Sequence, residues 1–193
     1  MIDNVYFPTS GLVSLVRHMK EKLTIEVGVI GNDGMVGIPV LLGGSFSFEE
    51  AIVQMAGEAL RMGTQAFKAE LTENDNPLVT DLLTFTRKLM KQMAQTAACN
   101  SVHTIEQRLS RWMLMCRDRM ESEELALTQE FIANMLGTRR EGVSAAAGVL
   151  QREGLIRYSR GHITILDRTG LEAFSCECYQ AIQEPGNGKS RIK

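Results

Sequence analysis

The stretch from residue 128 to residue 153 constrains the fold more than any other part of this sequence. Apolar residues recur at helical spacing before Gly137 and again after it, so the pattern predicts two helices. Only Gly137 and Thr138 separate them, and glycine readily adopts the left-handed conformation that ends a helix. Thr128 is expected to cap the first helix and Thr138 the second. The sequence therefore predicts a helix-turn-helix arrangement.

The second helix is predicted to have one buried and one exposed face. The buried stripe consists of small and aliphatic residues, namely Val143, Ala146, Ala147 and Leu150. The exposed N-terminal end carries Arg139, Arg140, Glu141 and Ser144. Such an end meets base edges when a helix lies in the major groove of DNA, where arginine bonds guanine and glutamate accepts from cytosine. Backbone amides near Thr138 and Arg139 can hold a phosphate.

A two-stranded wing is predicted after Gly154, with a turn at residues 159–161. We expect it to bring Arg157 and Arg160 to the same side. Residues 137–162 contain five arginines and two glutamates, a local charge of +3, whereas the whole chain carries −2. A charge run of this kind is often only a solvated helix end. The glycine turn, the small-residue helix, the wing and the local charge together favour a DNA-binding surface.

The first 63 residues are predicted to form β structure. Ile25, Val27 and Val29 alternate with less apolar residues, and glycines bound several short apolar runs. This pattern is typical of a small barrel or roll. Helices are expected from residue 64 onward, with Thr64 capping a short helix and Asn76 capping a long one whose first residue is Pro77.

The long helix, from residue 77 to about residue 100, carries an apolar stripe of Leu82, Phe85, Leu89 and Met93. Two interpretations are open. The stripe either forms the seam of a homodimer or packs on the chain's own barrel, and the length of the helix favours the dimer seam. A further helix follows within residues 102–120, with Leu109, Trp112 and Cys116 on one face.

Composition excludes several classes of function. No apolar run reaches the about 20 residues that a membrane span needs, and the N-terminus does not resemble a secretion signal, so we expect a cytoplasmic protein without membrane contact. The sequence shows no recognisable pair of nucleophile and base, no set of metal ligands and no phosphate-binding loop. We therefore expect that the protein is not an enzyme.

The four cysteines are Cys99, Cys116, Cys176 and Cys178, and their scattered positions fit a reducing compartment. Two thiolates in the sequence Cys-Glu-Cys do not suffice for zinc, which takes four ligands. Cys99 and Cys116 lie far away in sequence, and His103 has no ligand-like spacing. We therefore expect structural packing at these residues and predict no metal.

Several stretches resemble the Crp/Fnr family of bacterial transcription regulators. "LTQEFIANMLGTRREGVSAAAGVLQREGLIRYSRGHITILD" is similar to the family's winged helix-turn-helix, and "RLSRWMLM" is similar to the segment that precedes it. "VYFPTSGLVSLV" and "GMVGIPVLLGG" resemble strands of its cyclic-nucleotide-binding-type barrel. The resemblance implies a homodimer, a palindromic operator in double-stranded DNA and contact with RNA polymerase.

By position, the resemblance gives Arg140 and Glu141 base-reading roles and gives Arg139 and Gln129 phosphate contacts. Ala145 stands where the family often has a third base-reading arginine, so a different operator preference is expected. The runner-up interpretation is a sensor or adaptor protein that uses its barrel and winged helix for contacts with other proteins.

The resemblance also implies an α+β fold with distinct segments. We expect an incomplete effector-type β-barrel at 1–76, a dimerisation helix and hinge helix at 77–119, a winged helix-turn-helix domain at 120–184 and a flexible tail at 185–193. Family members usually carry more barrel before "VYFP", so this chain is expected to start within the barrel.

The cyclic-nucleotide pocket of the family is poorly matched. Met35 stands where the family has a ribose-binding glutamate, and Glu49 and Glu50 stand near the place of the arginine that holds the cyclic phosphate. Met93 and Ala94 replace hydroxyl residues of the long helix. We therefore predict that no cyclic nucleotide, and no other cofactor, is bound.

Overall fold

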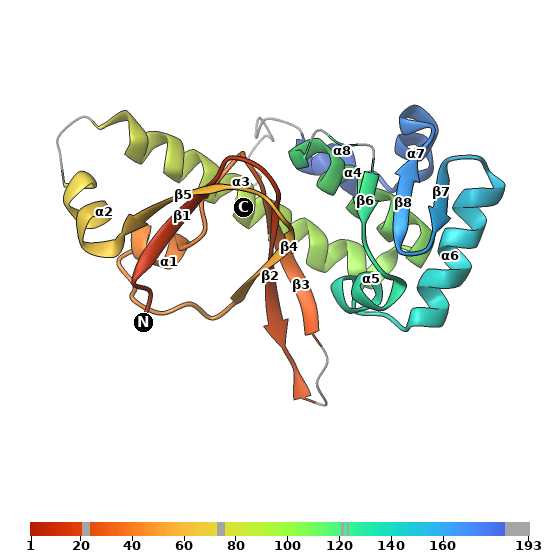
Figure 1. Ribbon diagram of the computed structural model, residues 1–193, viewed down its shortest axis with the longest axis horizontal. Coiled ribbons are helices and arrows are strands. Elements are labelled where there is room, and N and C mark those ends of the chain that lie inside the picture. Colours follow the sequence, from red (N-terminus) through yellow and green to blue (C-terminus); the bar gives the residue numbers. More distant parts are fainter. Residues whose placement is uncertain (21–23, 73–75, 121, 123, 184–193) are drawn as a thin grey trace, which may run out of the picture.

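The computed structural model of the chain describes residues 1–20, 24–72, 76–120, 122 and 124–183. Figure 1 shows the N-terminal strands at one end of the molecule and a winged helix at the other, with the long helix α3 running along the strands. The named strands pair antiparallel and helices pack beside them, as in the predicted α+β class. The predicted tail at 185–193 lies outside the described residues.

The N-terminal strands form two antiparallel sheets. Strands β1 (Asn4–Pro8) and β5 (Ala59–Gly63) pair with each other. In the second sheet β2 (Leu12–His18) lies between β3 (Thr24–Ile30) and β4 (Glu50–Met55). A bridge from Tyr6 to Val36 connects β1 to the segment that leads into the short helix α1 (Ile38–Leu41). Among the described residues the strands do not close into one barrel, so the domain is an open roll.

The short helix α2 (Thr64–Glu70) begins differently from the prediction. Its N-cap is Gly63, which makes no side-chain capping bond, and Thr64 is the first helical residue. The Thr64 hydroxyl instead donates to the Ile2 carbonyl at 2.7 Å. The predicted cap at Thr64 is therefore wrong, because a tertiary hydrogen bond to the N-terminal segment takes up the hydroxyl.

The long helix α3 (Pro77–Val102) begins as predicted. Asn76 is its N-cap, and Asn76 Oδ1 accepts a hydrogen bond of 3.0 Å from the Leu78 amide. Pro77 occupies the first turn, where its missing N–H has no intrahelical acceptor to lose.

One face of α3 packs tightly on the N-terminal sheets. Leu82, Phe85 and Leu89 are buried in one apolar cluster with strand residues such as Val5 and Ile30, and Met93 packs against that cluster. A Cβ at Gly34 would lie only 2.0 Å from Phe85, so the glycine permits this close approach. The predicted dimer seam therefore fails for these four residues, and the alternative, packing on the chain's own strands, is what the structure shows.

The C-terminal half is a compact winged helix joined to α3 by α4 (Ile105–Met120). It consists of β6 (Glu124–Ala126), α5 (Gln129–Leu136), α6 (Arg140–Arg152), β7 (Ile156–Ser159), β8 (His162–Ile165), α7 (Arg168–Phe174) and α8 (Cys178–Gln183). The sheet order is β6-β8-β7. Strand β6 was not predicted, because three residues are too few to display an alternating pattern.

Helix α4 connects the two halves through a shared core. Leu109, Trp112, Met113 and Cys116 are buried in a cluster that includes residues of β2, β3, α5 and α6. In the part of the chain that the structure describes, no helix has both the length and the apolar character required to cross a membrane.

Candidate nucleic-acid interface

Helix α5 begins and ends at the residues that the sequence predicts. The Thr128 hydroxyl accepts a hydrogen bond of 3.2 Å from the Phe131 amide and so caps α5. Gly137 ends that helix with φ 58°, in the left-handed region that favours glycine. The tight turn then directs the N-terminus of α6 outward.

The start of α6 differs from the prediction. Its N-cap is Arg139, which makes no side-chain capping bond. The Thr138 amide donates to the Ala133 carbonyl at 2.9 Å and thereby completes the end of α5. Thr138 therefore closes the first helix instead of capping the second. Amides at the start of α6 consequently lack a side-chain acceptor, and this leaves them available to an anion.

The two faces of α6 are those the sequence predicts. Val143, Ala146, Ala147 and Leu150 are buried. Arg139, Arg140, Glu141 and Ser144 are exposed at the N-terminal end, as is Ala145. A Cβ at Gly142 would lie 2.8 Å from Ile105 Cδ1, so α6 approaches α4 closely at this position.

The wing is a tight hairpin of β7 and β8, closed by the pair Ser159 and His162. Arg160 and Gly161 form its turn with φ values of 51° and 82°. Positive φ at both positions is the geometry of a type I′ turn. Glycine adopts it freely, whereas an arginine there is strained. Arg160 is therefore held at the tip of the wing by the hairpin geometry.

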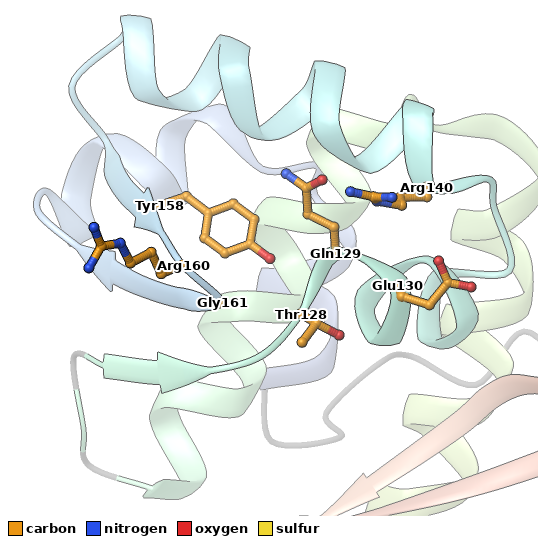
Figure 2. Close-up of a pocket in the computed structure, with 7 residues that line it drawn as sticks. All are labelled: Thr128, Gln129, Glu130, Arg140, Tyr158, Arg160 and Gly161. Atoms are coloured by element: carbon orange, nitrogen blue, oxygen red, sulfur yellow. The ribbon is translucent and has the colours of Figure 1, made fainter.

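A groove separates the wing from the N-terminal ends of α5 and α6 (Figure 2). Its volume is about 420 Å³, and its lining residues are Thr128, Gln129, Glu130, Arg140, Tyr158, Arg160 and Gly161. Figure 2 shows Arg140 and Arg160 toward opposite ends, with Gln129 and Tyr158 between them. Two cations therefore flank a concave surface that carries hydrogen-bonding groups.

Tyr158 is a residue of this groove that sequence reasoning missed. Its hydroxyl donates to the Leu127 carbonyl at 2.9 Å, and its amide donates to Gln151 Oε1 at 2.8 Å. Burial raises the pKa of the Tyr158 hydroxyl, and the nearby Arg140 cation opposes this shift. Only its place beside the predicted wing turn could have indicated this position from sequence.

The two wing arginines do not share a side. Arg160 lines the groove, whereas Arg157 is not among its lining residues. Arg157 precedes Tyr158 in β7, and neighbouring residues of a strand point to opposite faces. The expectation that Arg157 and Arg160 lie together is therefore corrected, because Tyr158 takes the groove-facing position.

A second hollow lies between the N-terminal strands and α3. Its volume is about 610 Å³, and its wall is mainly apolar, including Leu15, Phe46, Leu89 and Met93. Its described lining contains no lysine or arginine. Met35 is fully buried in the core and is not part of this wall.

The two glutamates near this hollow have different surroundings. Glu49 is part of the wall, whereas Glu50 lies in β4 and forms an ion pair with His18. Of the two carboxylates, only Glu49 therefore faces this hollow. Glu50 is diverted because it pairs with a residue on the adjacent strand β2.

This chain is similar to known transcription regulators in sequence and in fold. Residues 107–174 match the family of Crp-like helix-turn-helix domains. The transcriptional regulator LdrP of Thermus thermophilus is 25% identical over 182 residues, which are 88% of this chain and 91% of LdrP. A crystal structure of a CRP-family transcriptional regulator from Thermus thermophilus has a TM-score of 0.72 at 21% identity, with 90% of this chain and 88% of that chain covered. A CRP/FNR-family regulator from the same species has a TM-score of 0.68 at 25% identity, with the same coverage.

The paired helices, the hairpin wing and the groove between them define a winged helix-turn-helix DNA-binding protein. The chain carries a Crp-like helix-turn-helix domain and is a DNA-binding transcription regulator that resembles regulators of the Crp/Fnr family.

Proposed function

We propose that this regulator acts as a homodimer that reads a palindromic operator through the N-terminal end of α6. The observation that carries this proposal is the groove in which Arg140 of α6 and Arg160 of the wing flank Gln129 and Tyr158. A helix end and a wing arranged in this way contact the major groove and the adjacent backbone of one half-site. Two copies related by a twofold axis would contact two inverted half-sites.

Different residues of this surface have different proposed roles. Arg140 and Glu141 are exposed at the tip of α6 and read base edges, and Ser144 lies one turn further along the same helix. Arg139, Gln129, the Thr138 hydroxyl and the amides at the start of α6 contact phosphates near the helix start. Arg160 contacts the backbone from the wing, and Arg157 adds positive charge from the opposite face of β7.

The proposed dimer seam lies on the exposed face of α3. Leu83 is 51% exposed and Met90 is 66% exposed, seven residues apart on this helix. Ala94 and Ala97 continue the same face and are also exposed. The resulting stripe of apolar and small residues has the heptad spacing of a coiled-coil seam.

The hollow beside α3 favours a small apolar ligand over a cyclic nucleotide. Among the residues that the structure describes, the wall contains no lysine or arginine that could neutralise a phosphate, and Glu49 adds a carboxylate. Met90 belongs both to this wall and to the proposed seam, so an occupant could alter how two copies of α3 meet. We accordingly propose that no cyclic nucleotide controls the protein.

In vitro selection of bound duplexes from a random pool tests the function. We expect two inverted half-sites with a fixed spacing, because a twofold dimer places its two copies of α6 at a fixed separation. Retention on DNA should fall steeply with salt, because phosphate contacts release counterions. A protein adaptor without DNA specificity would yield no enriched sequence. Contact with RNA polymerase, a further proposed partner, is tested by transcription from a promoter that carries the selected site.

A further inference from the structure

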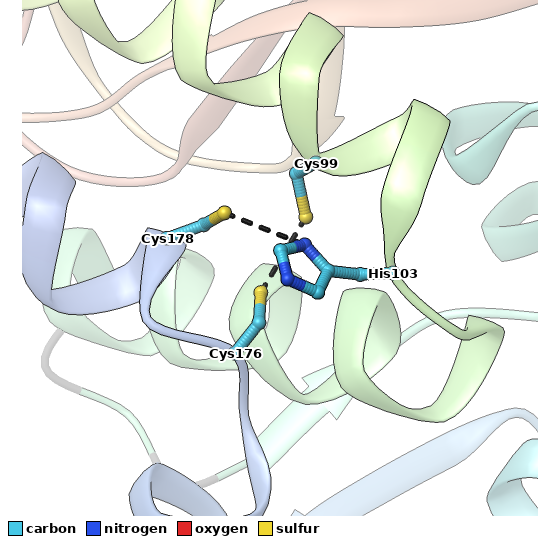
Figure 3. A group of neighbouring side chains, drawn as sticks. All are labelled: Cys99, His103, Cys176 and Cys178. Carbon is cyan, nitrogen blue, oxygen red and sulfur yellow. Dashed lines mark hydrogen bonds between the residues drawn. The ribbon is translucent and has the colours of Figure 1, made fainter.

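Four side chains from distant parts of the chain meet beside α3. Cys99 lies in the last turns of α3, and His103 is the C-cap residue of that helix. Cys176 lies between α7 and α8, and Cys178 is the first residue of α8. Figure 3 shows the three thiols and the imidazole pointing toward a common centre, and their potential ligand atoms all lie within 4.8 Å of one another.

We propose that Cys99, His103, Cys176 and Cys178 form a binding site for a single Zn²⁺ ion. Three thiolates and one imidazole are a recognised donor set for structural zinc, and Zn²⁺ takes four such ligands in a tetrahedron. The separation of Cys99 and Cys176 in sequence hides the site, because the fold alone brings these residues together. The sequence-based expectation of simple packing at the Cys-Glu-Cys segment counted only two ligands.

The distances within the cluster fit a mononuclear ion. Cys99 Sγ and Cys176 Sγ lie 3.5 Å apart, and Cys178 Sγ lies 3.5 Å from His103 Nδ1. Zn–S distances of about 2.3 Å and Zn–N distances of about 2.1 Å place the ligand atoms of a tetrahedral ion about 3.5 to 3.8 Å apart. A two-iron cluster distributes its ligands over two metal atoms and would need a wider arrangement.

Groups around the cluster orient two of the ligands. His103 Nε2 lies 3.2 Å from Glu177 Oε2, so Nδ1 faces the thiols while the other ring nitrogen meets a carboxylate. This is the carboxylate–histidine arrangement that commonly supports a metal-bound imidazole. Gln95 Nε2 donates to Cys178 Sγ at 3.0 Å, a contact that stabilises a thiolate.

Burial and nearby charge also suit an ion at this place. All three cysteines are buried and form an apolar cluster of their own. Arg111 is buried, and its positive charge acts on Cys99. Zinc with three thiolates carries one net negative charge, which a buried guanidinium can balance.

The ion would connect parts of the chain that perform different tasks. Cys99 and His103 belong to the helix that packs on the N-terminal sheets, whereas Cys176 and Cys178 follow the wing and α7. Bound zinc would therefore fix the end of α3 to the end of the winged-helix half. It would stabilise the folded chain by mass action, by an amount that grows with the logarithm of the ratio of free zinc concentration to dissociation constant.

Metal analysis of the untagged full-length protein is the first experiment. We expect about one zinc per chain after purification, following the four-ligand stoichiometry. Cobalt titration of the apoprotein should then give thiolate-to-cobalt charge-transfer bands and the strong visible bands of a tetrahedral ion, saturating at one equivalent. Zinc should raise the unfolding temperature of the apoprotein.

Variants identify the ligands. The double variant Cys99→Ser/Cys176→Ser should lose the cobalt spectrum and the zinc-dependent rise in unfolding temperature. Glu177→Gln should weaken zinc binding by about tenfold, because it removes only the partner of the imidazole. Cys116→Ser is the matched control, since Cys116 is equally buried but bonds to Gln54 outside the cluster.

Three results would overturn the proposal. The wild-type apoprotein could fail to bind cobalt or zinc stoichiometrically, and this result does not depend on how any variant folds. Iron with acid-labile sulfide could be found in place of zinc. Mass spectrometry could also show a Cys99–Cys176 disulfide in protein purified under reducing conditions.

Discussion

The indole Nε1 of Trp112 donates a hydrogen bond of 2.8 Å to Oε1 of Glu26, which joins helix α4 to strand β3. Ser14 on β2 donates to the other carboxylate oxygen at 2.5 Å. Glu26 is buried, and desolvation raises its pKa to about 7, although the two hydrogen bonds and the charges of Arg111 and Arg119 oppose the rise. A titratable group therefore lies at the junction of the N-terminal strands and the DNA-binding half.

This junction predicts a pH-dependent stability. The folded chain retains a proton on Glu26 up to pH of about 7, whereas an unfolded glutamate releases it near 4.5. The folded state thus binds more protons between these values, so this group's contribution to the free energy of unfolding falls as pH rises from 4.5 to 7. Above that range the folded chain must bury the charge.

Glu26→Gln should remove this dependence. The amide is neutral and keeps an oxygen that accepts from Trp112. We compare the free energy of unfolding of the variant with that of the wild type. This difference should be larger at pH 8 than at pH 4, in favour of the variant, by up to about 3 kcal/mol, because a pKa shift is linked to stability. Urea unfolding of both proteins across this pH range measures it. Parallel pH profiles for the two proteins would contradict the assignment.

The wing and the helix tip should respond differently to mutation. Arg140→Ala should weaken operator binding by about 1–3 kcal/mol and relax the preference at one base pair in each half-site. Arg160→Ala should weaken binding to all sequences more evenly, because its proposed contact is with the backbone. Affinities for operator and random duplexes at two salt concentrations measure this difference.

Arg152→Ala is the matched control for both arginines, since Arg152 is exposed at the opposite end of α6. It should leave operator affinity nearly unchanged. Equal losses on operator and random DNA for Arg140→Ala and Arg160→Ala would contradict the division of roles.

The exposed face of α3 should control the oligomeric state. Leu83→Lys/Met90→Lys places charges in the proposed seam and should yield monomers with poor operator affinity, as light scattering and gel-shift titration would report. Leu60→Lys alters a residue of β5 that is 68% exposed and should leave the dimer intact. A monomeric wild type at micromolar concentration would refute the seam.

Local signals explain the parts of the fold that the sequence predicted. Asn76 with Pro77, Thr128 and Gly137 act through hydrogen bonds and backbone preferences within a few residues, and all three helix boundaries are confirmed. The buried stripe of α6 followed from its helical period. Thr64 and Thr138 have the same local chemistry as true caps, but backbone and tertiary hydrogen bonds decide their roles.

Long-range arrangement explains the rest. Helix α3 has apolar residues on two faces, and periodicity does not reveal which face meets the strands and which remains exposed. Tyr158 enters the groove only because the wing folds back on α5. The cluster of Cys99, His103, Cys176 and Cys178 likewise depends on contact between α3 and α8, which no pattern within either segment indicates.

The turn glycine should be sensitive to a small substitution. Gly137→Ala forces an alanine into a conformation with φ 58°, which costs about 1–2 kcal/mol for a residue with a Cβ. The new Cβ would lie 3.4 Å from Ile25 on β3, which is ordinary van der Waals contact, so the cost comes from the backbone conformation. We expect thermal unfolding to occur at a lower temperature. Gly154→Ala shares the positive φ and has open space around it, so similar losses at the two positions would assign the cost to the backbone conformation.

Cyclic AMP and cyclic GMP should not regulate DNA binding by this protein. The hollow beside α3 offers no described lysine or arginine to a phosphate, and Glu49 lies on its wall. At about 4 Å and an effective dielectric constant of about 20, a like-charge contact costs about 4 kcal/mol before relaxation. That is about a thousandfold in affinity. Calorimetric titration at millimolar nucleotide should show no saturable heat, and operator affinity should not change.

Glu49→Gln removes the carboxylate and tests this reason directly: binding that appeared only in this variant would identify Glu49 as the obstacle. Saturable binding by the wild type below about 100 μM, with tighter operator binding, would show that a cation outside this wall holds the phosphate.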